Sequence, residues 1–293
     1  LRQSLDGYVM SSLNVALLQY TARAHEADTQ KTIMPMMTTA AAKGARLIAL
    51  PECATRLDGD RARLMATANT QDDSAILGTF REFAALHKVW IAVGSMVLLA
   101  DQSDGARLVN RSLMINPDGA ITAHYDKIHM FDVVINETES YRESAHYHPG
   151  STAVLTNVDN ANIGMSICYD LRFPHLYQDM AKAGAGVMMI PSAFTVATGI
   201  AHWEVLLRAR AIETGSFVLA AAQTGSHEPG PDGSIRKTYG HSMIISPWGD
   251  VLARLGKDTG ICTAVLNLNT ITHARNRLPV LSQNRAYSIK TLS

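Results

Sequence analysis

Cysteine is scarce in this chain and forms no recognisable pattern. The three cysteines, Cys53, Cys168 and Cys262, lie far apart in 293 residues and include no Cys-x-x-Cys pair. Such a sparse, odd-numbered set argues against a disulfide framework and a structural zinc site, and it favours a reducing compartment. We therefore expect a cytoplasmic protein.

An excess of one charge and a long apolar run are also lacking. The 26 basic residues balance the 26 acidic ones, and no basic stripe occurs, so neither nucleic acid nor an anionic membrane is expected as a partner. No apolar run approaches the roughly 20 residues that span a bilayer. What remains, 47% hydrophobic and 18% charged, is an ordinary globular composition.

The two ends of the chain are expected to lie outside the fold. Residues 1–9 lack the apolar core of a signal peptide and precede Met10, which begins a stretch typical of a natural start. We expect residues 1–9 to be upstream or vector-derived, residues 10–285 to form a single domain, and residues 286–293 to form a tail.

The sequence nearly repeats itself in order. Four segments of the first half have counterparts in the second: 14–20 and 162–168, 43–52 and 183–192, 89–94 and 217–222, 112–120 and 242–250. Each match is weak, but four in one order indicate two similar halves. Strand ends that correspond should then lie near each other, at a pseudo-twofold axis.

Apolar strands alternate with helices in both halves. The runs 47–50 and 187–190 are expected to be strands buried on both faces. Residues 74–87 and 203–213 carry apolar residues at helical spacing, in the second case Val205, Leu206, Ala209 and Ile212. Residues 116–119 and 246–249 are turns, and 226–237 is expected to be a loose loop. This alternation predicts an α/β fold with two packed sheets and helices outside.

Cys168 combines a buried strand with a turn. It ends the apolar run 161–167 and opens the turn 168–174. A strand that delivers a thiol to a sheet edge suits a nucleophile, although most lone cysteines are small apolar core residues.

Three charged residues are candidates to act with this thiol. Glu52 follows the apolar run directly, where a carboxylate is costly unless it is paired or functional, although an exposed loop residue is the alternative. Lys127 has apolar and aromatic neighbours, and Glu143 lies among aromatic residues and histidines. A solvated lysine and a polar loop are the respective alternatives.

These residue types have a joint chemical purpose. A cysteine thiol is mostly protonated near neutral pH and needs a base or a nearby cation. A glutamate can take the thiol proton, a lysine can stabilise the thiolate and an oxyanion, and a second glutamate can hold the lysine. The backbone N–H of Tyr169 would be a further oxyanion donor. Such a set suits attack on an amide or nitrile carbon through a thioester.

Three blocks resemble the signature motifs of the nitrilase superfamily, the carbon–nitrogen hydrolases. They are Leu-Pro-Glu at 50–52, Asp-Lys-Ile-His at 126–129 and Ile-Cys-Tyr-Asp-Leu-Arg-Phe-Pro at 167–174. They occur in the order and spacing of that family, and the resemblance extends over essentially residues 12–285.

The resemblance implies a fold and a set of roles. The fold would be an α-β-β-α sandwich with two pseudo-symmetric halves. Glu52 would be the general base, Lys127 the oxyanion stabiliser and Cys168 the nucleophile, with Glu143 matching a second, structural glutamate. No metal or organic cofactor is implied.

Further segments resemble one branch of the superfamily. Residues 191–195, 202–213, 239–243 and 247–249 are similar to the amidases that hydrolyse deaminated glutathione and to the related ω-amidases, which act on α-ketoglutaramate. The resemblance implies a small-molecule amide substrate and a homodimer, or a higher homo-oligomer, formed through helices that follow Cys168. The stretch 131–139 departs from the pattern and is expected near the pocket entrance.

Substrate contacts are expected close to the nucleophile. Arg172 is a candidate to hold a carboxylate remote from the reacting amide, and its alternative is a salt bridge with Asp170 or a loop carboxylate. Ser192, Phe194 and Thr195 follow the strand end that corresponds to Glu52 and are candidate wall and hydrogen-bonding groups.

Other functions remain open on the sequence. An N-carbamoyl amino acid hydrolase, an aliphatic amidase or a nitrilase would use the same residues. An inactive scaffold of the same fold is a different class, which the intact Glu52, Lys127 and Cys168 oppose. A redox role for Cys168 would need a resolving cysteine, and none is near in sequence.

Overall fold

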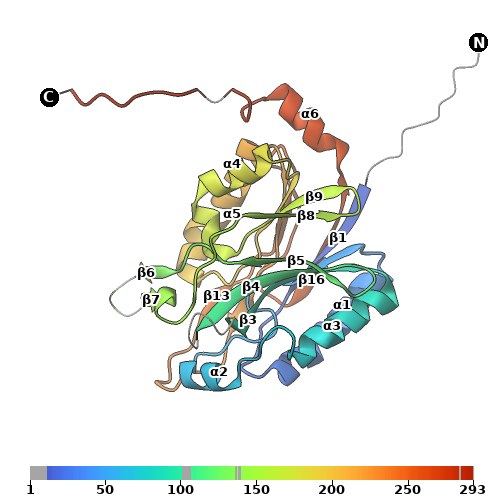
Figure 1. Ribbon diagram of the computed structural model, residues 1–293, viewed down its shortest axis with the longest axis vertical. Helices are drawn as coiled ribbons and strands as arrows, with labels where there is room; N and C mark the ends of the chain where they lie inside the picture. Colours follow the sequence, from blue (N-terminus) through green and yellow to red (C-terminus); the bar gives the residue numbers. More distant parts are fainter. Residues whose placement is uncertain (1–11, 101–106, 136, 138–139, 284, 293) are drawn as a thin grey trace, which may run out of the picture.

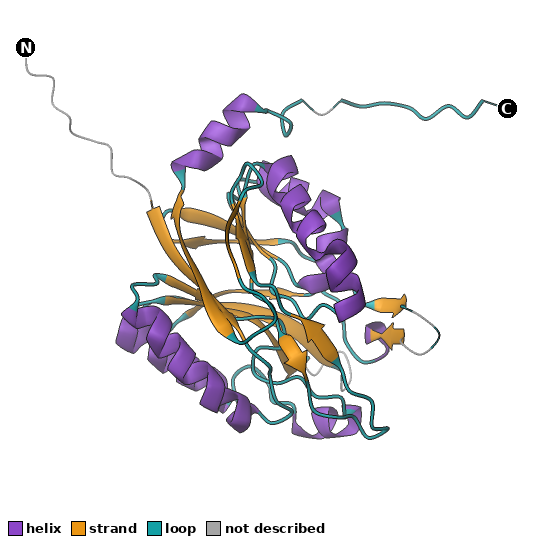
Figure 2. Cartoon of the chain, turned by 180° about the vertical axis from the view of Figure 1, so that it is seen from behind, coloured by secondary structure: helices purple, strands orange, loops and turns teal. Residues whose placement is uncertain are grey.

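The computed structural model describes residues 12–100, 107–135, 137, 140–283 and 285–292. The expected N-terminal segment 1–9 lies outside them. Two six-stranded sheets form the centre of the molecule, with helices on the two outer sides (Figures 1 and 2).

Each sheet is built mainly from one half of the duplication, and the first sheet also includes β16 from the C-terminal end of the chain. The first runs β16 (Gly260–Asn267), β1 (Ser12–Gln19), β2 (Leu47–Ala49), β3 (Trp90–Leu99), β4 (Leu108–Ile115), β5 (Ile121–Asp126). The second runs β8 (Val154–Val158), β9 (Ala161–Met165), β10 (Val187–Met189), β11 (Phe217–Ala220), β14 (Met243–Ile245), β15 (Val251–Arg254).

The pairings match strand for strand. In both sheets the three strands from β1 or β9 onward are parallel, and the flanking strands are antiparallel. The predicted turns 116–119 and 246–249 join β4 to β5 and β14 to β15. The duplication inferred from sequence is therefore a duplication of topology.

The helices cover the outer faces of the sheets. Besides these strands, the described residues contain α1 (Glu26–Ala42), α2 (Arg61–Thr67), α3 (Ala75–His87), α4 (Pro174–Lys182), α5 (Val196–Thr214) and α6 (Asn269–Arg277). Two small hairpins pair β6 (Asp132–Val134) with β7 (Ser140–Arg142) and β12 (Thr224–Ser226) with β13 (Lys237–Tyr239), and short 3-10 turns span Glu143–Ala145 and Cys168–Arg172.

Apolar side chains fill three layers because successive strand residues face opposite sides. In β2, Leu47 and Ala49 pack between the sheets, whereas Ile48 packs under the helices of the first half. In β10, Val187 packs between the sheets and Met188 under α4 and α5. Both runs are buried on both faces, as predicted, and this rigid frame holds the strand ends in place.

The helix predicted at 74–87 is α3, which Ser74 caps by accepting from the Leu77 N–H. The helix predicted at 203–213 begins earlier, because Thr195 caps α5 by accepting from the Thr198 N–H. The apolar residues named for this helix are only partly buried, since Leu206 packs against the core but others of the set do not. The buried residues include Trp203, Leu207, Arg210 and Ala211, whereas Val205 is 69% and Ile212 48% exposed. Two stripes of α5 are apolar, so hydrophobic spacing alone cannot select the inner one.

The segment predicted as a loop at 226–237 is a mostly exposed loop between β12 and β13, but it is anchored rather than loose. His227 is 4% exposed, with its ring bonded to the Ala22 carbonyl and the Thr238 hydroxyl. Glu228 accepts from the Ala24 N–H. Proline and glycine indicate where a chain turns, but not what anchors the turn.

No helix in the described ranges is both long and apolar enough for a bilayer span. The predicted tail, described over residues 285–292, has no helix or strand and runs away from the body of the protein beyond α6 (Figure 1).

Candidate active site

The thiol of Cys168 is placed by a sharp change in backbone direction. Cys168 lies three residues beyond β9 with a positive φ of 50°, a left-handed conformation that is uncommon outside glycine. Its N–H donates to the Pro191 carbonyl at 2.9 Å, which ties the turn to the segment after β10. The side chain is 8% exposed and opens onto a cavity.

The carboxylate of Glu52 is held from several sides at the end of β2. Oε2 accepts from the Ala193 N–H at 2.9 Å, and Oε1 accepts from Lys127 Nζ and Asn110 Nδ2, each at 3.0 Å. Glu52 lines the same cavity as Cys168, and the neighbouring thiol helps to lower the pKa of the carboxyl group. Glu52, only 3% exposed, is therefore a buried, oriented carboxylate.

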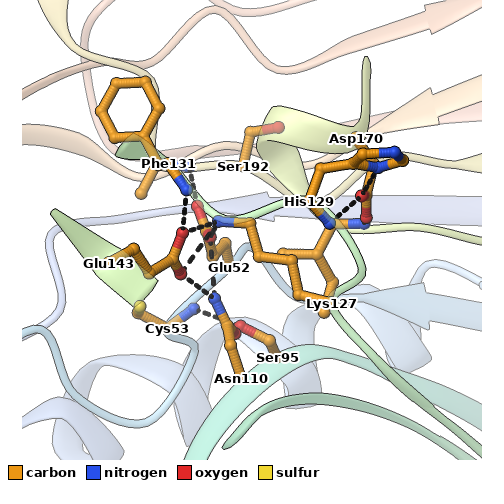
Figure 3. Close-up of polar contacts among 12 residues, drawn as sticks. Glu52, Cys53, Ser95, Asn110, Lys127, His129, Phe131, Glu143, Asp170 and Ser192 are labelled. Carbon is orange, nitrogen blue, oxygen red and sulfur yellow. Dashed lines mark hydrogen bonds and ion pairs between the residues drawn. The ribbon is translucent and has the colours of Figure 1, made fainter. Parts of the chain in front are cut away.

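Lys127 links two carboxylates (Figure 3). Its ammonium lies 3.0 Å from Glu52 Oε1 and 2.9 Å from Glu143 Oε2. Glu143 is itself held by the Phe131 N–H at 2.6 Å and by Asn110 Nδ2 at 3.3 Å. A buried ammonium that is paired twice has a defined position and a defined charge.

The protonation states follow from these neighbours. Burial opposes the charge on Glu52, but Lys127 and the Cys168 thiol outweigh it and hold the pKa of Glu52 below its usual range. Burial, reinforced by the charge of Glu52, raises the pKa of Cys168. Burial opposes the charge on Lys127, but Glu143 and Glu52 raise the pKa of its ammonium well above the ordinary value. The resting site therefore holds a thiol, an ionised base and an ammonium.

These groups lie at a cavity of about 940 Å³. Its lining includes Glu52, Lys127, Glu143 and Cys168, and also Tyr169, Arg172, Phe194 and Thr195. No group of three or more metal-ligating side chains suited to a metal ion occurs within the described ranges. A thiol, a base and an ammonium at one cavity can carry out acyl transfer through a covalent thioester.

Comparison with known proteins identifies the family. Residues 14–276 match the carbon–nitrogen hydrolase family. The chain belongs to the carbon–nitrogen hydrolases. A deaminated glutathione amidase from Yersinia enterocolitica is 37% identical over 280 residues, which cover 95% of this chain and 95% of that protein.

Solved structures agree with this assignment. The Caenorhabditis elegans NitFhit protein superimposes with a TM-score of 0.84 at 35% identity over 94% of this chain, which spans 65% of that longer chain. Saccharomyces cerevisiae Nit3, described as a member of branch 10 of the nitrilase superfamily, gives 0.81 at 25% identity over 94% of this chain and 97% of its own. The resemblance and the α-β-β-α fold predicted from sequence are both confirmed.

The candidate substrate contacts of this hydrolase separate into two groups. The side chains of Phe194 and Thr195 line the cavity. Ser192 is fully buried, does not appear in the described lining, and donates its hydroxyl to the Ile190 carbonyl at 3.1 Å. The structure therefore directs the Ser192 side chain to the backbone rather than to the cavity.

Arg172 does not form the salt bridge with Asp170 considered as an alternative. Its Nη1 lies 3.2 Å from His202 Nδ1, and its guanidinium lies 5.4 Å from the centre of the Phe194 ring. Asp170 instead accepts from the Tyr125 hydroxyl at 2.7 Å and is bonded to the His129 ring. Within the part of the chain that the structure describes, Arg172 has no carboxylate partner.

Sequence reasoning missed two residues of this site. Asn110 is 3% exposed in β4 and bridges Glu52 and Glu143. A polar amide inside an apolar strand is a signal that could have identified it. Arg236 lines the cavity from the β12–β13 hairpin and donates to the Ala193 carbonyl at 3.0 Å. No local pattern marks it, because the hairpin folds back from a distant part of the chain.

Proposed function

We propose that this carbon–nitrogen hydrolase is an amidase for small ω-amides of 2-oxo acids, of the deaminated glutathione type, and that it acts through a thioester on Cys168. The observation that supports this most directly is that the Cys168 thiol lines one cavity together with the buried Glu52–Lys127 pair. The name of the Yersinia enterocolitica relative supports the substrate class.

In the first half-reaction Glu52 takes the thiol proton while sulfur attacks the amide carbon. The oxyanion forms beside Lys127 and the Tyr169 N–H, which stabilise it. Glu52 then gives its proton to the amine nitrogen, the C–N bond breaks, and a thioester remains on Cys168.

In the second half-reaction water replaces the amine. Glu52 removes a proton from the water, and the resulting hydroxide attacks the thioester carbon. The C–S bond breaks, sulfur regains the proton, and the carboxylic acid leaves. Glu143 does not react; it holds Lys127 and compensates part of its charge.

The acyl group needs a cation for its 2-oxo acid carboxylate. Arg172 follows the nucleophile in the same turn, lines the cavity and has no carboxylate partner in the described ranges. A planar guanidinium can bind a carboxylate through two parallel hydrogen bonds. Arg172 is therefore the residue proposed to orient the acyl end of the substrate.

The test is a screen of amine and ammonia release over deaminated glutathione, α-ketoglutaramate, N-carbamoyl amino acids and simple nitriles. The Cys168→Ala variant is the matched control, and it should keep the fold while losing turnover. Mass spectrometry of the quenched wild type should detect the acyl adduct on Cys168. Product release by the alanine variant would refute the covalent mechanism. A preference of the wild type for N-carbamoyl amino acids would refute the proposed substrate class.

A homodimer in the cytoplasm is also proposed. Val205 and Ile212 lie seven residues apart on the outer face of α5 and are 69% and 48% exposed, which favours a partner for that face. Light scattering should report a dimer for the wild type. A monomeric wild type, or a dimer unchanged by Val205→Glu with Ile212→Glu, would refute this interface.

A further inference from the structure

Three buried polar atoms have no hydrogen-bond partner among the described residues: Arg56 Nε, Asn110 Oδ1 and Arg236 Nε. All three belong to residues that line the cavity at Cys168. A buried polar group without a partner is costly, so native proteins rarely retain one without a reason. Two of the three are guanidinium donors, which favours an anion as the missing partner.

The charges around the cavity are also unbalanced. Four acidic residues line the cavity. Lys127 engages Glu52 and Glu143, Asp58 pairs with Arg63, which is not among the lining residues, and Asp232 accepts from the N–H and hydroxyl of Ser234. By contrast, neither Arg56 nor Arg236 forms an ion pair within the described ranges. In a chain with no net charge, unneutralised guanidiniums that gather at one cavity favour an anionic ligand.

The two arginines come from segments that pack together. A methyl group added to Gly59 would lie 3.1 Å from Gly230 Cα, so the segment after Glu52 meets the β12–β13 hairpin directly. Arg56 is 6% exposed and is held by a 2.8 Å bond from Nη1 to Thr67 Oγ1. Arg236 is held through Nη2 on the Ala193 carbonyl and lies 5.6 Å from the centre of the Tyr141 ring. Both guanidiniums are therefore positioned before any ligand arrives.

These arginines lie on the Glu52 side of the nucleophile. The peptide group of Ala193 donates to Glu52, and the carbonyl of the same residue accepts from Arg236. Arg56 is four residues beyond Glu52. Because Glu52 must protonate the departing nitrogen, whatever that nitrogen carries is expected to extend toward this side.

We propose that Arg236 and Arg56 form a second anion subsite, which binds a carboxylate carried by the amine leaving group. This rests on the proposed amidase function and deepens it. The preferred substrate is an amide with a carboxylate at each end: a 2-oxo acid on the acyl side, and an amino acid or short peptide with a free C-terminus on the other.

The test compares two substrates that differ only at the far end: deaminated glutathione and its C-terminal carboxamide. In the wild type, kcat/KM should be at least ~10-fold higher for the acid, since charge-assisted hydrogen bonds are the strong ones. Arg236→Gln, and separately Arg56→Gln, should lower kcat/KM for the acid by at least ~10-fold and kcat/KM for the carboxamide by less than ~3-fold. Lys257→Gln changes an exposed cation that is not among the lining residues, and it should change kcat/KM for either substrate by less than ~2-fold. Arg172→Ala should lower kcat/KM for both substrates by a similar factor.

A binding measurement separates this proposal from the function on which it rests. In the Cys168→Ala background, calorimetry should show that Arg236→Gln weakens the binding of deaminated glutathione but not the binding of its carboxamide. Equal losses on both substrates, or no preference of the wild type for the acid, would overturn the subsite. The amidase proposal would survive that result if the wild type still hydrolysed both compounds; if it hydrolysed neither compound, the function itself would fail.

Discussion

The two halves of this protein share a topology but not a chemistry. Cys168 follows β9, and its counterpart in the first half is Tyr20, which follows β1 and is fully buried with its hydroxyl 2.8 Å from the Ala54 carbonyl. Glu52 follows β2, and its counterpart is Ser192, also fully buried and bonded to backbone. Cys168 and Glu52 line the cavity, whereas their counterparts Tyr20 and Ser192 are buried in the core.

This comparison separates the scaffold from the site. The duplicated sheets bring corresponding strand ends together, as the contact between Glu52 and the Ala193 N–H illustrates. The groups that complete the site come from parts outside the repeated strands: Glu143 after the β6–β7 hairpin and Arg236 in the β12–β13 hairpin. The duplicated strands thus form the frame, and the differences between the halves at its edges form the candidate site.

The largest expected contrast concerns two lysines. Lys257 corresponds to Lys127 in the register of the duplication, but it is exposed. Lys127→Ala should lower kcat by at least ~10²-fold, because it removes an oxyanion donor, whereas Lys257→Ala should change kcat by less than ~2-fold. Steady-state kinetics on deaminated glutathione, with circular dichroism as a check on folding, measures both. Similar losses in the two variants would remove Lys127 from the catalytic centre.

A second prediction concerns the β12–β13 hairpin of the second half, where a buried histidine makes the free energy of unfolding depend on pH. Burial lowers the pKa of His227 to about 4, from the ordinary value of 6.5. Between these values the unfolded chain binds a proton that the folded protein does not, so the stabilisation is complete above pH 6.5 and is lost as the pH falls toward 4. The shift corresponds to at most ~3 kcal/mol.

Urea denaturation at pH 7 and pH 4.5 measures this effect. The His227→Gln variant is the control, because it lacks the titrating ring while retaining a polar side chain. The free energy of unfolding should fall more with acidification in the wild type than in this variant. An equal fall in the free energy of unfolding in both proteins would mean that His227 does not keep its buried, neutral state.

A smaller effect is expected at the counterpart of the nucleophile. Tyr20→Phe removes the donor to the Ala54 carbonyl and should lower the free energy of unfolding by about 1–2 kcal/mol. Because Tyr20 lies in the core rather than at the cavity, kcat/KM should stay within about threefold of the wild type. A tenfold loss of kcat/KM without a change in stability would show that the first half also contributes to the chemistry at this position.

The smallest expected effect is that of pH on the rate. The pKa of Glu52 is lowered below 4.5 and that of Lys127 is raised well above 10.5. None of the lining residues that the structure describes is a histidine. The carboxylate is lost only at acidic pH and the ammonium only at alkaline pH, so kcat/KM should vary by less than about twofold between roughly pH 6 and 8. A steep change of kcat/KM with pH near pH 7 would indicate that a group other than Glu52 is the base.

Much of the site could be predicted from local patterns. The triad of Glu52, Lys127 and Cys168 follows from charged or reactive residues at the ends of apolar strands, together with the family motifs. The inner face of α5 could not be predicted, since both stripes are apolar and packing of Trp203 against Phe194 selects one. The anchoring of the 226–237 segment was missed because its contacts reach Ala22 and Ala24, some two hundred residues earlier.

The amino-acid sequence alone was sufficient for the alternation of strands and helices, the two related halves and the choice of candidate reacting groups, because these depend on residue type, spacing and order. Protonation and substrate selection depend on distance and burial. Glu52 is an ionised base because Lys127, 75 positions away, lies 3.0 Å from it. Likewise, only the folded chain buries Arg236 Nε without a partner among the described residues, which is the basis of the proposed anion subsite. Electrostatic energies depend on separation and local solvation, and these are properties of the folded chain.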